Sequence, residues 1–150
     1  MTKDVIIGIS GLQFTGESGA DSLEMIAPGE YFLRNGRHYV KYEEVIEGFA
    51  ERNQNLVKIS PNKLEVTKKG LTNIHMVFEE NKKNLTCYST PYGNLMIGIE
   101  GGPVSIQETD DRIEVRANYS LDINYEHVAN CEIRMHIQSK EAQQFSLTEM

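Results

Sequence analysis

The residues Arg112–Ile123 alternate strictly between two kinds of side chain, and this period of two constrains the fold more than any other feature of the sequence. One parity carries the apolar and aromatic residues Ile113, Val115, Ala117, Tyr119, Leu121 and Ile123, and the other carries only polar and charged ones. Because successive side chains of a β-strand point to opposite faces, the pattern predicts a long strand with one buried face. Residues 131–138 repeat it, which indicates an antiparallel partner beyond a connection over Asn124–Asn130.

Strand-like segments fill most of the remaining chain, and turn-forming residues separate them. We expect further strands at Val5–Phe14, Leu23–Ala27 continuing past Pro28-Gly29, Leu56–Ser60, Lys63–Lys68, Ile74–Glu79, Leu85–Thr90, Asn94–Glu100 and Val104–Thr109. Short strands spaced about ten residues apart are typical of a barrel or a sandwich. The first strand mixes its parities, which indicates bends at Gly8 and Gly11 of the kind that close barrels. One short helical turn is expected around Glu47–Arg52.

The dipeptide Asn35-Gly36 predicts a two-residue hairpin turn, because both residues adopt positive φ readily. In that register Leu33 lies opposite His38. One face of the hairpin then carries Tyr31, Leu33, His38, Val40, Tyr42 and Glu44, and we expect it to point inward. The other face carries Phe32 and Tyr39 among five charged residues, and we expect it to be exposed.

The whole chain, residues 1–150, is expected to form one domain of the all-β class, a single closed antiparallel barrel of about ten strands. Its core spans about residues 3–138, and the tail 139–150 is expected to fray. The longest apolar run, Val5-Ile6-Ile7, is far shorter than the roughly 20 residues that span a bilayer. With no signal-peptide pattern at the start, we expect a cytoplasmic protein with Cys87 and Cys131 as reduced, half-to-fully buried thiols.

Charge argues against a nucleic-acid partner. The net charge is −7, and only residues 56–83 are locally basic, with six lysines against three glutamates. Nucleic-acid binders concentrate more cations and interleave them with arginine and aromatic side chains. We expect these lysines to decorate strand edges and turns, where they hinder edge-to-edge aggregation.

No motif in the sequence predicts catalysis or metal binding. The four histidines, His38, His75, His127 and His136, lack the spacing of a metal site. Asp122, Asn124 and Glu126 begin like a calcium loop, but the required glycine and later glutamate are missing. The glycine-rich stretches lack the features of a phosphate loop. We therefore expect no enzyme, no cofactor and no metal.

Several short motifs resemble the YwiB-like family of uncharacterised bacterial proteins. They are Tyr88-x-Thr90-Pro91-Tyr92-Gly93-x-Leu95 with Gly70 upstream, the late Ile113-x-Val115-x-x-x-Tyr119-x-Leu121, Tyr42-Glu43-Glu44 and Val57-Lys58-Ile59-Ser60. The resemblance spans roughly residues 3–138. It implies a closed barrel of the calycin type, the group of lipocalins and fatty-acid-binding proteins, and it implies no reaction.

Three classes of function remain open at this point, of which an enzyme is the least favoured because no nucleophile–base pair is visible. A ten-stranded barrel leaves room for a small amphipathic ligand, and the inward parities offer the ligand-binding candidates Tyr31, His38, Tyr42, Glu44 and Tyr119. Leu33, Val40 and Leu121 would supply apolar contacts. The alternative is a protein-interaction or structural module with a filled barrel, which uses exposed Phe32 and Tyr39 as its surface. We expect no membrane partner, and the oligomeric state is open.

Overall fold

The computed structural model of the chain describes residues 1–11, 24–46 and 48–140. Within these residues ten antiparallel strands form one sheet. They are β1 (Asp4–Ser10), β2 (Glu24–Arg34), β3 (Arg37–Val45), β4 (Arg52–Ser60), β5 (Lys63–Lys69), β6 (Ile74–Glu79), β7 (Lys83–Thr90), β8 (Gly93–Glu108), β9 (Arg112–Ile123) and β10 (Glu126–Ser139). The strand order is β6-β5-β4-β3-β2-β1-β10-β9-β8-β7. The described residues contain no helix that is long and apolar enough to cross a membrane.

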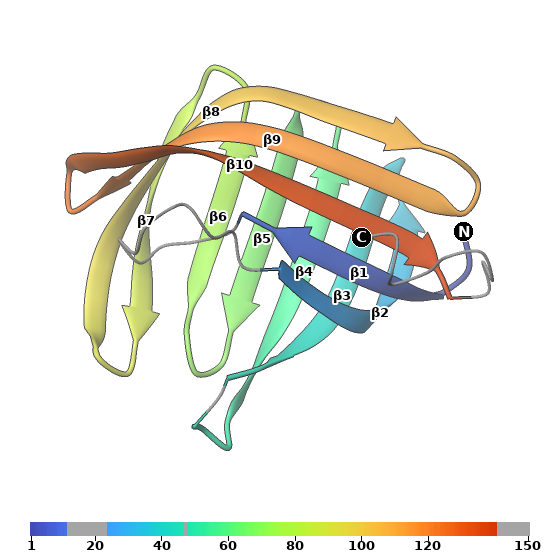
Figure 1. Cartoon of the computed structure of the whole chain (residues 1–150), viewed down its shortest axis with the longest axis horizontal. Coiled ribbons are helices and arrows are strands. Elements are labelled where there is room, and N and C mark those ends of the chain that lie inside the picture. The colour runs from blue at the N-terminus through green and yellow to red at the C-terminus, as the bar shows by residue number, and fades with distance from the viewer. Residues whose placement is uncertain (12–23, 47, 141–150) are drawn as a thin grey trace.

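The sheet curls until its two outer strands, β6 and β7, lie side by side (Figure 1). The fold is therefore a nearly closed barrel, as expected. At one end of this seam, Asn73 and Ser89 exchange backbone hydrogen bonds of 2.9 and 3.0 Å. At the other end, the turn after β6 bonds to Gly101 of β8, through Asn81 N to Gly101 O and Gly101 N to Lys82 O. A Cβ on Gly101 would lie 2.1 Å from the Glu79 carbonyl oxygen, so a glycine allows this close approach.

The predicted element boundaries are wrong in several places. Asn94–Glu100 and Val104–Thr109 are one strand, β8, because pairing with β9 resumes after a bulge between Gly101 and Val104. The connection Asn124–Asn130 is a tight turn instead, in which Asn124 and Tyr125 have φ of 51° and 70°.

The third error concerns the expected helical turn around Glu47–Arg52. Arg52 already begins β4, and residues 48–51 contain a turn and a bend. Glu47 lies outside the described residues. β1 ends at Ser10, before the predicted end at Phe14, which lies outside the described residues. Ser139, predicted to begin a fraying tail, is the buried last residue of β10, and residues from 141 on lie outside the described part.

The hairpin between β2 and β3 has the predicted register, with Leu33 opposite His38. Asn35 and Gly36 both have positive φ, as the turn requires. His38, Val40 and Tyr42 are buried, but Leu33 is 63% exposed. The prediction that Leu33 is buried is therefore wrong, because the hairpin tip extends past the core.

Side chains from almost every strand fill the middle of the barrel. The fully buried ones with 0% exposure are Val5, Ile7, Val40, Val57, Leu64, Val66, Met76, Phe78, Ile97, Ala117, Ile133 and Ile137. The rings of Phe78 on β6 and Tyr119 on β9 touch edge to face. Since these strands are not neighbours in the sheet, the contact joins separate walls of the barrel.

Two expectations about single side chains need correction. Cys87 is exposed on β7 rather than half-buried, because the outer parity of β7 faces away from the core. Cys131 on β10 is partly buried against the core, and neither cysteine forms a disulfide. Lys68 was expected at a strand edge, but its parity on β5 is that of Leu64 and Val66, so it lies inside the barrel.

Candidate functional site

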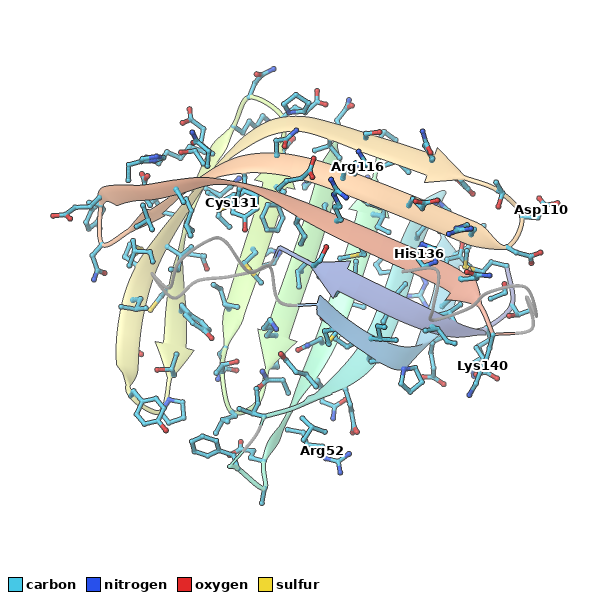
Figure 2. All side chains as sticks on the ribbon, in the orientation of Figure 1. Arg52, Asp110, Arg116, Cys131, His136 and Lys140 are labelled. Carbon is cyan, nitrogen blue, oxygen red and sulfur yellow. The ribbon has the colours of Figure 1, made fainter. Side chains whose placement is uncertain are left out.

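The inward faces of β3, β4 and β5 change from apolar to polar toward the end of the barrel where β3 ends. On β4, Asn53 and Asn55 precede the core residues Val57 and Ile59 at the same parity. These amides are 0% and 3% exposed. Strand alternation therefore places amide and charged groups where a continued core would need apolar ones. In Figure 2, labelled Arg52 marks this end at the start of β4.

One carboxylate oxygen collects three donors in this region. Glu44 Oε1 accepts hydrogen bonds from Lys68 Nζ at 2.8 Å and from the Nδ2 atoms of Asn53 and Asn55, each at 3.1 Å. Burial raises the pKa of Glu44, but the charge of Lys68 and these hydrogen bonds outweigh it and lower the pKa below its ordinary value. Glu44 and Lys68 therefore form a half-buried ion pair at neutral pH.

The polar cluster continues toward the seam of the barrel. Asn53 Nδ2 donates to Thr72 Oγ1 at 2.7 Å, and Asn53 Oδ1 accepts from Thr72 N at 3.0 Å. On β7, burial raises the pKa of the Tyr88 hydroxyl, which also has a hydrogen bond with Thr72 and feels the charge of Glu44. Burial likewise raises the pKa of Tyr42 well above its ordinary value. We call Tyr42, Glu44, Asn53, Asn55, Lys68, Thr72 and Tyr88 the polar cluster.

One buried acceptor of the polar cluster has no partner. The Oδ1 atom of Asn55 is buried and has no hydrogen-bond partner among the described residues. The amide of Asn55 is oriented by its nitrogen, because only Nδ2 can donate the hydrogen bond to the Glu44 carboxylate. A buried acceptor left without a donor costs about 1–3 kcal/mol. This atom is the unsatisfied position of the polar cluster.

Two other predicted site residues lie at the opposite end of the barrel. Tyr31 Oη and His38 Nδ1 are 2.7 Å apart, and His38 Nε2 lies 3.2 Å from Glu108 Oε1. Burial and the nearby charge of Glu108 raise the pKa of Tyr31. Because β3 and β8 are not neighbours in the sheet, the contact between His38 and Glu108 spans the barrel mouth. Sequence reasoning missed Glu108.

Tyr119, the fifth predicted site residue, belongs to the core. Its Oη donates to the carbonyl oxygen of Gly11 at 3.0 Å, and its ring packs on Phe78. The five predicted residues therefore do not form one site. Tyr42 and Glu44 lie in the polar cluster, Tyr31 and His38 at the other mouth, and Tyr119 between them.

The parity of strands could have revealed the residues that sequence reasoning missed. Asn53, Asn55 and Lys68 each lie two residues or four residues from a core position on the same strand. Assigning amide and lysine side chains to the surface by type hid this signal. Thr72 precedes β6 in a turn, where alternation gives no information.

Comparisons with known proteins agree with this fold. Residues 7–135 match a family model described as "Domain of unknown function (DUF1934)". The crystal structure of the ywiB protein from Bacillus subtilis is similar, with a TM-score of 0.76 and 13% sequence identity. The similarity covers 91% of this chain and 92% of that one. Together these findings confirm the expected resemblance. A search of curated proteins found no match.

Proposed function

The chain belongs to the DUF1934 family, and we propose that it is a non-enzymatic barrel that binds a small amphipathic molecule at the polar cluster. The observation that carries the proposal is the unpartnered, buried Oδ1 atom of Asn55. Buried polar groups in proteins are almost always hydrogen-bonded, to the protein, to water or to a ligand. A ligand that donates to this atom would complete the polar cluster.

The position of the polar cluster limits the size of the ligand. Side chains fill the barrel around the contact between Phe78 and Tyr119, so the ligand would occupy only the end of the interior. Its apolar part would pack against Ile74, Tyr88 and Leu95, which lie on inward parities near this end. Pockets with few polar groups and apolar walls fix the orientation of small ligands in this way.

The chemistry of the polar cluster favours a neutral hydroxyl over a carboxylate. Asn55 Oδ1 can only accept a hydrogen bond, and a carboxylate has no proton to donate. A carboxylate would also lie near the ionised Glu44, whose charge Lys68 already neutralises. An alcohol avoids the repulsion and supplies the missing donor.

The experiment compares octanol with octanoate as probes, by calorimetry and by the NMR signals of the Asn55 side-chain amide. We expect octanol to bind and octanoate to bind at least about tenfold more weakly, a difference of about 1.4 kcal/mol. Asn55→Leu should abolish the preference for octanol. The control is Gln54→Leu, because Gln54 is exposed and its side chain donates a hydrogen bond to exposed Glu43 and not to the polar cluster. Absence of octanol binding, or equal binding to the Asn55→Leu variant, would contradict the proposal.

We also propose a bacterial, cytoplasmic location for the protein. The two cysteines support it, because neither forms a disulfide and reduced thiols are usual in the cytoplasm. Fractionation of cells that produce the tagged chain would test it. Recovery of the protein outside the cytoplasm would contradict this part of the proposal.

A further inference from the structure

Aromatic and basic side chains gather on the outer face of β2, β3 and β4. Phe32 and Tyr39 are direct cross-strand neighbours there, at the parity opposite to buried Val40. A hollow in this face is lined by Phe32, Arg34, Tyr39, Lys41 and Leu56. We call these five residues the basic hollow. The hairpin places Arg34 and Lys41 on one face, and β4 brings Lys58 opposite Tyr39 on the same face.

Three cations in and around the basic hollow form no ion pair within the described residues, whereas Lys58 beside it pairs with Glu65 at 3.7 Å. Arg34 and Arg37 lie directly opposite each other across the hairpin, and like charges in this position are destabilising. Within residues 1–11, 24–46 and 48–140, Arg34, Arg37 and Lys41 have no carboxylate at ion-pair distance. Glu30 lies opposite Lys41 across the hairpin, but Arg34 and Arg37 face each other, so cross-strand pairing does not account for the two arginines. The chain as a whole carries a net charge of −7, so this positive patch differs in sign from most of the protein.

The rings in this face already hold two of the cations. Lys41 Nζ lies 5.4 Å from the centroid of the Phe32 ring, and Lys58 Nζ lies 5.8 Å from that of Tyr39. Such cation–π contacts hold the ammonium groups beside the apolar floor of the basic hollow. The surface thus presents positive charge at the rim and an apolar centre, the arrangement typical of protein docking sites.

We propose that the basic hollow docks an acidic protein segment that carries one large apolar side chain. Carboxylates of the segment pair with Arg34, Arg37 and Lys41, and the apolar side chain packs against Phe32, Tyr39 and Leu56. Because β3 is hydrogen-bonded to β2 and β4 on both sides, the segment cannot add a strand here. Recognition therefore rests on side chains and on complementary charge.

A single-stranded nucleic acid fits this surface less well. Lys41 and Lys58 each lie over one face of Phe32 and of Tyr39, so a flat base cannot stack on that face. An apolar side chain does not need a full ring face, since it can pack against the ring edges and Leu56. Glu43 and Glu65 border the patch, and a long polyanion would also meet the excess negative charge of the chain. A short acidic segment avoids both problems.

The test measures fluorescence anisotropy of a labelled peptide in which Asp and Glu residues flank one Phe. We expect binding that weakens as salt is added, because the contacts at the rim are ionic. Lys41→Glu should weaken binding by about tenfold, which corresponds to 1.4 kcal/mol. The matched control is Arg116→Glu, the same charge change on β9 across the barrel (Figure 2), where Arg116 lines a separate outer hollow. This control should change affinity by less than about twofold.

Three outcomes would overturn the proposal. The first is an absence of peptide binding, and the second is an equal loss for Lys41→Glu and Arg116→Glu, which would indicate only a response to net charge. The third is tighter binding of a labelled single-stranded oligouridine than of the peptide. Replacing Phe by Ser in the peptide should also weaken binding, and an unchanged affinity would remove the apolar part of the proposed contact. Both variants alter exposed side chains, so unfolding is not expected to confuse the result.

Discussion

Phe78 and Tyr119 meet edge to face inside the barrel, with ring centroids 4.9 Å apart and ring planes at 69°. Phe78 is 0% exposed and Tyr119 is 3% exposed. Edge-to-face pairs of aromatic rings are favourable beyond the area that they bury. Because the two rings come from strands β6 and β9, the contact holds separate walls of the barrel together.

Removal of the Tyr119 ring should destabilise the protein strongly. We expect Tyr119→Ala to lower the free energy of unfolding by on the order of 3 kcal/mol, since truncation of a buried aromatic leaves a cavity. Tyr119→Phe keeps the ring, removes the hydrogen bond to the Gly11 carbonyl and should cost about 1 kcal/mol. Urea unfolding measures both. A loss below about 1 kcal/mol for Tyr119→Ala would show that the ring is not part of the core.

The seam of the barrel should be sensitive to a single methyl group at Gly101. Its ideal Cβ would lie 2.1 Å from the Glu79 carbonyl oxygen, and a backbone atom cannot move aside as a flexible side chain can. We expect Gly101→Ala to lower the free energy of unfolding by about 1–3 kcal/mol, the usual range for overpacking. Thermal unfolding and urea titration measure the change.

The neighbouring glycine provides the control for this prediction. A Cβ on Gly102 would have its nearest contact at 3.3 Å, to the Asn118 carbonyl oxygen. Gly102→Ala should therefore destabilise the protein less than Gly101→Ala. Equal effects would mean that the two substitutions act through the bulge in general and not through the contact with Glu79.

Much of the fold could be predicted because alternation and turn chemistry are local. Arg112–Ile123 forms β9 with the predicted bounds, and the turn at Asn35-Gly36 has the predicted register. The prediction failed where residues typical of turns do not form one, and where a turn forms without them. Gly101-Gly102-Pro103 forms a bulge within β8, and Tyr125 adopts a positive φ that is rare for an aromatic residue.

The candidate site was predicted only in part, because its geometry depends on which strands meet. Alternation correctly placed Tyr42 and Glu44 inside the barrel. It could not show that Lys68 would pair with Glu44, or that Glu108 would reach His38 across the mouth. The first contact joins two strands that flank β4, and the second joins β3 to β8 across the barrel. Neither contact is encoded by a local pattern in the sequence.

The two cysteines should differ in reactivity, because Cys87 is exposed and Cys131 is partly buried against the core. Under native conditions a thiol reagent should modify Cys87 at least about tenfold faster than Cys131. Cys87→Ser should remove the fast phase, and Cys131→Ser should keep it. Protein denatured without exposure to air should show two reactive thiols, and a count of none would contradict a reduced state in the cytoplasm.

The ion pair between Glu44 and Lys68 should make stability depend on acid pH. The folded pKa of Glu44 lies below its ordinary value of 4.5, so at low pH the unfolded chain binds the proton more readily. The stability that Glu44 contributes is therefore complete above about pH 5 and is lost as the pH falls through 4.5 and then through the lower folded pKa. Urea unfolding across this range measures it.

The Glu44→Gln variant separates this contribution from those of other carboxylates. At pH 7 the variant should lose on the order of 2 kcal/mol, less than for a fully buried pair, because the Glu44 side chain is 23% exposed. The difference from the unmodified protein should shrink as the pH falls below 4.5. Glu43→Gln is the matched control. The pKa of Glu43 is also lowered, by hydrogen bonds from Gln54 and Arg52, but these contacts are exposed to solvent, so this variant should lose less stability at pH 7 than Glu44→Gln. If the loss in free energy of unfolding caused by Glu44→Gln stays constant down to pH 3, the contact with Lys68 does not stabilise the ionised form of Glu44.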